Sequence, residues 1–170
     1  MFLFEVLTQP QVFFERLKSQ NMQWAMPSFL LFLFFILSSF IPLLLGVLTE
    51  KDLLASLIFN SIGLVVFLLC AWGLSGTMRI LEVLGFSLIA VLLAMLLMSG
   101  LWFLGDLARG LGSVLILVAL LFSSRAVWIG VSVMTQNPAT AWRTVLFAPL
   151  LTFLFMAVPF GLLVRLLGLA

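Results

Sequence analysis

Five stretches of this 170-residue chain are each long and apolar enough to cross a lipid bilayer. A hydrocarbon core of roughly 30 Å needs about 20 residues of helix at about 1.5 Å per residue. Because no water reaches this core, every backbone N–H and C=O group must be paired within its own segment, so each span must be a helix. The predicted spans are residues 25–48, 53–74, 80–104, 111–134 and 144–164.

The composition places nearly the whole chain in the membrane. Hydrophobic residues make up 65% of it and charged residues 8%, more apolar surface than one soluble core can hide. We therefore expect an all-α membrane protein whose residues 25–170 form one bundle of five transmembrane helices. The first apolar run, from about Ala25, is too long for the core of a signal peptide, so we expect it to be retained.

Residues 1–24 form a separate N-terminal segment. Pro10 opens the stretch PQVFFERLKSQ, and proline suits a helix's first turn because its missing N–H would be unpaired there anyway. Val12, Phe13 and Leu17 lie toward one side, and Glu15, Arg16 and Lys18 toward the other. The pattern predicts a short amphipathic helix at the membrane interface, with a frayed tail as the alternative.

The positive charges favour one orientation weakly. Lys and Arg near the span ends number four on the N-terminal side, at Arg16, Lys18, Arg79 and Arg143, and three on the other, at Lys51, Arg109 and Arg165. Positive residues are more frequent in cytoplasmic loops. We expect a multi-pass protein with a cytoplasmic N-terminus and an external C-terminus.

Small residues and prolines predict how the helices meet. In the fourth span, Ala119, Ser123, Ala126 and Gly130 share one narrow face that would let a neighbouring helix approach closely. The fifth span holds Pro149 and Pro159, each of which removes a backbone hydrogen bond, so this span is expected to bend. Between these spans, TQNPATAWR at residues 135–143 is interpreted as a polar connector.

The chain lacks the usual equipment of catalysis. It has no histidine and one cysteine, Cys70, so we expect no metal site, no cofactor and no catalytic residue. Its net charge of +2 comes from charges spread along the sequence, which excludes a nucleic-acid partner. Polar candidates within the spans are Glu82, Asn60 and Arg125, too few to predict an enzyme.

Arg125 is the most conspicuous of these candidates. It lies nine residues before the end of its span, about 13 Å from that boundary. Glu82 near the start of the third span is the expected ion-pair partner, and Ser132 lies on the same side of the helix as Arg125. Three interpretations stay open: a structural pair or a contact to interfacial lipid phosphate, an anion or lipid-headgroup site on a transport path, and a partner-docking site.

Asn60 lies one turn after Ser56 and one turn before Gly63. An amide inside a membrane span most often forms a hydrogen bond between helices. We therefore predict such a bond first, and a contact to a ligand second.

Two short motifs resemble the bacterial members of the Yip family of membrane proteins. The first, LTQPQVFFERLKSQNMQWAMPSFLL, carries the resemblance through Pro10, Phe13, Phe14, Leu17, Trp24 and Pro27. The second, GTMRILEVLGFSLIA, carries it through Gly76, Glu82, Gly85 and Phe86, although the proline expected soon after Phe86 is absent. The resemblance implies a five-helix membrane domain with a cytoplasmic N-terminus. Eukaryotic members are associated with Rab-type GTPases, but they carry a long N-terminal cytosolic region that is not expected here, so Rab binding is not carried over.

Two hypotheses for the function follow. The first is a Yip-like, non-enzymatic protein of a bacterial inner membrane that organises lipids or partner proteins. The alternative is a small oligomeric transporter or lipid-moving protein with an anion contact at Arg125. Membrane lipids are the expected partners under both, and association with other membrane proteins or with further copies of the chain is left open.

Overall fold

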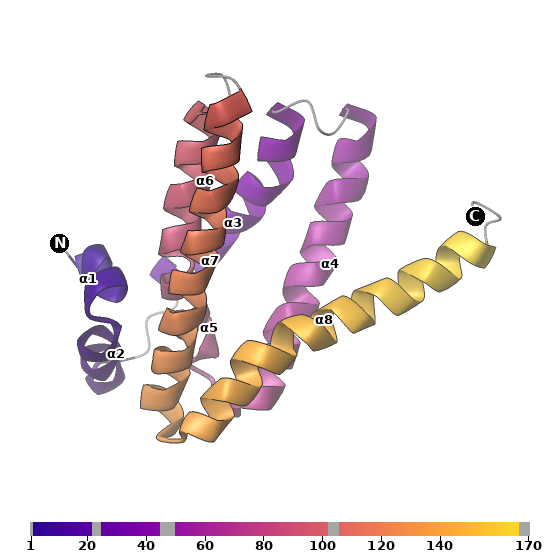
Figure 1. The fold of residues 1–170 in the computed structure, drawn as a ribbon. Coiled ribbons are helices and arrows are strands. Elements are labelled where there is room, and N and C mark those ends of the chain that lie inside the picture. The colour runs from indigo at the N-terminus through magenta and orange to yellow at the C-terminus, as the bar shows by residue number, and fades with distance from the viewer. Residues whose placement is uncertain (1, 22–24, 45–49, 102–105, 167–170) are drawn as a thin grey trace.

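A computed structural model describes residues 2–21, 25–44, 50–101 and 106–166, and within these ranges all regular structure is α-helix (Figure 1). The helices, in chain order, are α1 (Phe2–Thr8), α2 (Pro10–Ser19), α3 (Ala25–Leu44), α4 (Glu50–Ser75), α5 (Ile80–Ser87), α6 (Ile89–Leu101), α7 (Asp106–Thr135) and α8 (Pro138–Leu166). The predicted all-α class is confirmed.

Four of the described segments are long and apolar enough to cross a membrane. They are Ser56–Ser75, Ile80–Gly100, Gly110–Thr135 and Pro138–Ala157. The apolar helix at Ala25–Ile41, within the first expected span, is shorter. The chain is therefore a multi-pass membrane protein with at least these four candidate spans.

The segment predicted as the third span is interrupted near its middle. Leu88 separates α5 from α6, although its N–H still bonds to the carbonyl of Leu84 at 3.1 Å and its own carbonyl accepts from Leu92 N–H at 2.9 Å. The two helices therefore continue one another as a single apolar segment. The proline expected soon after Phe86 is absent, and Ala90 lies near that position. The interruption at Leu88 therefore occurs without a proline.

The predicted length of the connector at residues 135–143 is wrong. Helix α8 begins at Pro138, so only Gln136 and Asn137 lie between α7 and α8. Gln136 turns the chain with a φ of 56°. The side-chain oxygen of Asn137 then accepts hydrogen bonds from the N–H groups of Ala139 at 3.0 Å and Thr140 at 3.4 Å. Asn137 thus caps α8, and Pro138 takes the first helical position, which needs no N–H.

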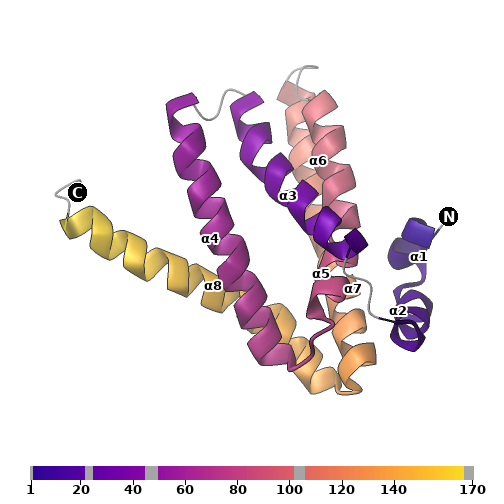
Figure 2. The same cartoon turned by 180° about the vertical axis from the view of Figure 1, so that it is seen from behind.

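The predicted N-terminal amphipathic helix exists as α2, and its apolar face is packed against protein. Phe13, Phe14 and Leu17 are fully buried. The ring of Phe13 meets that of Phe86 on α5 edge-on at a centroid distance of 5.1 Å. Figures 1 and 2 show α1 and α2 together along the side of α7. The exposed residues of α2, such as Glu15 and Arg16, are mainly polar.

The small-residue face predicted for the fourth span is buried, and its role in close packing is confirmed at Gly130. Ala119, Ser123, Ala126 and Gly130 on α7 are all buried. A Cβ atom placed on Gly130 would lie 2.7 Å from Val83 Cγ1 of α5 and 3.0 Å from the ring of Phe14 of α2. Glycine therefore permits three helices to meet at this point.

A second close crossing joins α3 to α5. A Cβ atom on Gly85 would lie 2.6 Å from the carbonyl oxygen and 2.7 Å from the Cα atom of Pro27. Because these are backbone atoms, the two helices can approach this closely only if residue 85 has no side chain.

Helix α8 continues past Pro149 and Pro159, and its C-terminal end, beyond the crossing with α4, stands apart from the other helices in both views (Figures 1 and 2). Its N-terminal half packs closely, because Ala141, Thr144 and Ala148 are buried and small. These three residues are three, four and seven apart, which is one helix face. Beyond Ala148 the chain turns to large exposed side chains, including Phe153 and Phe155.

Candidate functional site

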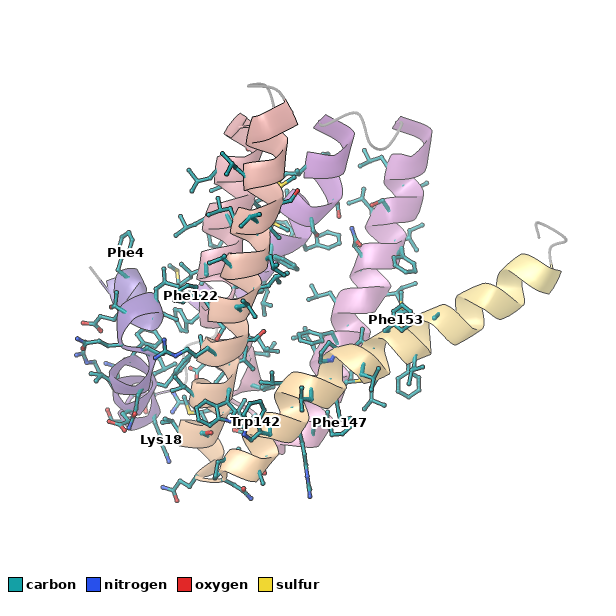
Figure 3. All side chains as sticks on the ribbon, viewed as in Figure 1. Phe4, Lys18, Phe122, Trp142, Phe147 and Phe153 are labelled. Atoms are coloured by element: carbon teal, nitrogen blue, oxygen red, sulfur yellow. The ribbon has the colours of Figure 1, made fainter. Side chains whose placement is uncertain are left out.

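The divergence of α8 opens a cavity of about 590 Å³ among the membrane helices. It is bounded by α3, α4, α7 and α8, with Leu84 and Leu88 at one side. Figure 3 places Phe153, one of the lining residues, on α8 where that helix passes α4. Most of the lining is apolar, as shown by Phe34, Phe35, Phe59, Phe67, Val127 and Met156.

Six polar side chains interrupt this apolar lining, and none of the described residues that line the cavity is charged. They are Ser38, Asn60, Ser123, Ser124, Thr144 and Thr152. A concave, mainly apolar site with a few polar groups is typical of small-molecule binding.

Asn60 is the one predicted site residue that lines this cavity. Its side-chain Nδ2 donates to Ser39 Oγ of α3 at 3.0 Å and to Ser56 Oγ of α4 at 3.4 Å. The predicted hydrogen bond between helices is confirmed by the bond to Ser39. That Asn60 also contacts a ligand stays a prediction, which its place in the cavity wall favours.

Glu82 lies away from the cavity, in a junction between α2 and the start of α5. Its side chain is 1% exposed, and it accepts a hydrogen bond from Arg79 Nε. The remaining guanidinium nitrogens of Arg79 donate to the carbonyl oxygens of Leu17 at 2.7 Å and Lys18 at 3.0 Å. Arg79 therefore satisfies the last carbonyls of α2 while Glu82 holds its charge, a junction called here the α2 clasp.

The expected Glu82–Arg125 pair is wrong, because Glu82 pairs with Arg79 three residues away on its own helix turn. Arg125 is exposed, and the described residues offer it no hydrogen bond or ion pair. Gly130, the α7 residue beside Val83, lies about 140° around the helix from Arg125. The face of α7 that meets α5 is thus not the face that carries Arg125.

Arg125 also points away from the cavity. The α7 residues that line it are Leu120, Ser123, Ser124 and Val127. Their mean direction lies about 150° around the helix from Arg125, taking 100° per residue. The structure therefore does not bring Arg125 and Asn60 into one site.

Ser132 lies two turns beyond Arg125 on the same side of α7. Its hydroxyl oxygen is buried, and so is the indole nitrogen of Trp128 one turn earlier. Neither atom has a hydrogen-bond partner among the residues that the structure describes. The predicted role of Ser132 in ligand binding stays a prediction.

Arg79 and Lys18, which the sequence predicts only as charges near a membrane boundary, also join helices in the fold. Lys18 Nζ donates to the carbonyl oxygen of Val133 at 2.8 Å, in the last turn of α7. Both cations therefore bind the carbonyl ends of helices, where the helix dipole is negative. The signal for this pair in the sequence is the spacing of Arg79, a basic residue that lies one helix turn before Glu82.

A scan of protein-family models, a search of curated proteins and a search of solved structures return no match to this chain. A function is therefore inferred from the chain's own residues.

Proposed function

We propose that this protein is a non-enzymatic, Yip-like integral membrane protein that holds a membrane lipid in the cavity between α3, α4, α7 and α8. The observation that carries the proposal is the cavity itself, about 590 Å³ in volume and lined mainly by apolar side chains. Ligand sites in proteins are commonly about 300–1,000 Å³ and mostly apolar, so the size and the lining both fit.

The position of the cavity favours a lipid chain as its occupant. Ser38, Asn60, Ser124 and Thr152 each lie more than ten residues from the Ser75–Pro138 end of the bundle, about 16–23 Å along their helices. Acyl chains are the surrounding solvent at this depth. An empty apolar space would forfeit the dispersion contacts of its walls, whereas a lipid chain entering from the bilayer supplies them.

The two motifs that carry the Yip resemblance meet in the fold. Phe13 of the first motif packs on Phe86 of the second, and Pro27 of the first crosses Gly85 of the second. Residues 73 and 58 positions apart in the sequence thus form one structural junction.

The same proposal includes five spans, with α3 as the first, in a bacterial inner membrane. Arg16, Lys18, Arg79 and Arg143 would then mark the cytoplasmic side, and α2 would lie at that interface against the bundle. Reporters of compartment fused to the two termini test this topology. We expect signals from opposite sides, and signals from the same side would contradict it.

A contact of Arg125 to anionic lipid is a secondary proposal. An arginine in the membrane costs about 2.5–3.5 kcal/mol on insertion scales, which favours a nearby anion. Its exposed side chain has no partner among the described residues, so a lipid phosphate is the nearest source. Arg125→Gln should then reduce co-purification of anionic lipid, and unchanged recovery would contradict the contact. A transport path through Arg125 gains no support from the cavity, which lies on another face of α7.

Mass spectrometry of the purified protein tests the lipid-holding proposal. Ser124 lines the cavity from α7, and Ser124→Trp would fill part of it. We expect this variant to lose most of the co-purified lipid that the parent retains after detergent exchange. Leu121→Trp adds the same ring on the same helix at a side chain that is 65% exposed and outside the cavity, so it should retain the lipid. Equal retention by both variants would overturn the proposal.

A further inference from the structure

Four of the five hydroxyl groups that line the cavity already donate their protons within the protein. Each donates to a carbonyl oxygen of its own helix: Ser38 to Phe35 at 2.9 Å, Ser124 to Leu120 at 2.8 Å, Thr144 to Thr140 at 3.0 Å and Thr152 to Ala148 at 2.7 Å. A hydroxyl has one proton and two lone pairs. These four side chains can therefore accept a hydrogen bond from a ligand but have no free proton to donate.

Asn60 likewise offers a ligand an acceptor in place of a donor. Its Nδ2 is directed to Ser39 and Ser56, and its carbonyl oxygen receives no hydrogen bond from the described residues. Ser123 carries the one lining hydroxyl without a hydrogen bond among those residues, so it can donate or accept. Acceptors thus outnumber free donors along the described wall of the cavity.

We propose that the cavity selects a neutral lipid bearing a hydroxyl donor, such as a long-chain or isoprenoid alcohol or a diacylglycerol. This inference rests on the proposed lipid-holding function and names the class of lipid. The hydroxyl of the ligand donates to the oxygens of Asn60, Ser124 or Thr152, while its chain packs on the phenylalanines. The predicted ligand contact of Asn60 is then through its carbonyl oxygen.

The described lining of the cavity also disfavours the binding of an anion. A carboxylate or phosphate needs donors or cations, and the described lining offers one free hydroxyl and no charged side chain. At this depth no water supplies the missing hydrogen bonds, so a buried anion loses its hydration without compensation. Anionic lipid should therefore be excluded from the cavity, whatever its affinity for Arg125 on the other face of α7.

Photolabelling with three probes of equal chain length tests the inference: a long-chain primary alcohol, its methyl ether and the corresponding fatty acid, each with a mid-chain diazirine. The protein is embedded in phosphatidylcholine nanodiscs, and labelled peptides from α4 and α8 are counted. One hydrogen bond between neutral groups is worth about 2- to 12-fold in binding. We expect the alcohol to label these helices about 5-fold more than the ether or the acid.

A double variant locates the preference in the cavity. Ser124→Ala with Thr152→Val removes two of the three acceptor oxygens assigned to the ligand at little change in shape, so the preference for the alcohol over the ether should fall, while Asn60 keeps its oxygen. The matched control is Ser61→Ala with Ser99→Ala, whose hydroxyls also bond to their own helices but lie outside the cavity. It should keep the preference of the parent.

The outcomes separate the two proposals. Equal labelling by the three probes, or stronger labelling by the acid, would overturn the selectivity and leave the lipid-holding function standing. No labelling of α4 or α8 by any probe would overturn both. A preference for the alcohol that is undiminished in Ser124→Ala with Thr152→Val would contradict the role assigned to these oxygens.

Discussion

The α2 clasp predicts that Arg79→Ala detaches α2 from the bundle. Arg79 donates two hydrogen bonds to the carbonyl oxygens of Leu17 and Lys18, and its side chain is 16% exposed. Hydrogen bonds to a charged group contribute about 1.5–3 kcal/mol each, so the pair contributes about 3–6 kcal/mol before water replaces it. We take the lower end, about 3 kcal/mol, because water can reach part of the site. That corresponds to a roughly 100-fold larger detached population.

Trypsin measures this population directly, because Arg16 and Lys18 within α2 are cleavage sites. Cleavage follows the population of the open form when closing is faster than cutting. We expect Arg79→Ala to raise the cleavage rate at these two sites by about 100-fold, with Arg79→Lys intermediate because one ammonium cannot match the fork of the guanidinium.

The control is Arg125→Ala, which removes an exposed arginine that has no partner among the described residues and should leave the rate unchanged. Cleavage after Arg143, on α8, reports on the rest of the bundle in the same digest. A rate in Arg79→Ala equal to that of the parent would refute the clasp. So would an equal acceleration at Arg143, because it would mean global unfolding in place of local release.

Further predictions concern stability in detergent, measured by reversible unfolding. Gly85→Ala should destabilise by about 1–3 kcal/mol, since its Cβ would meet the backbone of Pro27 at 2.6–2.7 Å. Gly73→Ala has no atom within 4 Å of the new Cβ, so it should be neutral or stabilise by up to about 1 kcal/mol; the same sign for both variants would contradict the crossing. Asn137→Ala removes the cap of α8 and should cost about 1 kcal/mol, which an unchanged midpoint would refute. Asn60→Leu loses one hydrogen bond between helices and should cost about 0.6 kcal/mol; a loss of several kcal/mol would show that the residue does more than join α3 to α4.

Features that depend on local chemistry were predictable from the sequence. Long apolar runs determined the helical class, since unpaired backbone groups are excluded from hydrocarbon. The small residues from Ala119 to Gly130 correctly indicated the packing face of α7, because close approach requires little side-chain volume. The pattern around Pro10 correctly indicated the helix α2.

Features that depend on which surfaces meet are harder to predict from the sequence. The face of α2 that was expected to contact lipid contacts α5 and α7, a choice that helical periodicity alone does not decide. Glu82 was matched to Arg125 by depth, whereas the nearer Arg79 needs no long-range closure and also binds the end of α2. Asn137 followed by Pro138 is a typical start of a helix, but the polarity of residues 135–143 favoured a connector there.

The cavity itself could not be predicted from any single segment. It arises because Ala141, Thr144 and Ala148 bring the first half of α8 close to its neighbours, and the helix then diverges from α7 while it crosses α4. The volume left between α3, α4, α7 and α8 depends on how these helices cross, which the sequence pattern does not specify. Asn60 was recognised as a polar residue in a span, but its place in the cavity wall required the fold.

The most direct measurement is a high-resolution structure of the protein in lipid nanodiscs, with and without Ser124→Trp. We expect elongated density between α4 and α8, in contact with Asn60 and Thr152, that disappears in the variant. If α8 instead packs along its whole length against the bundle and leaves no space or density there, the chain does not hold a lipid in the way proposed.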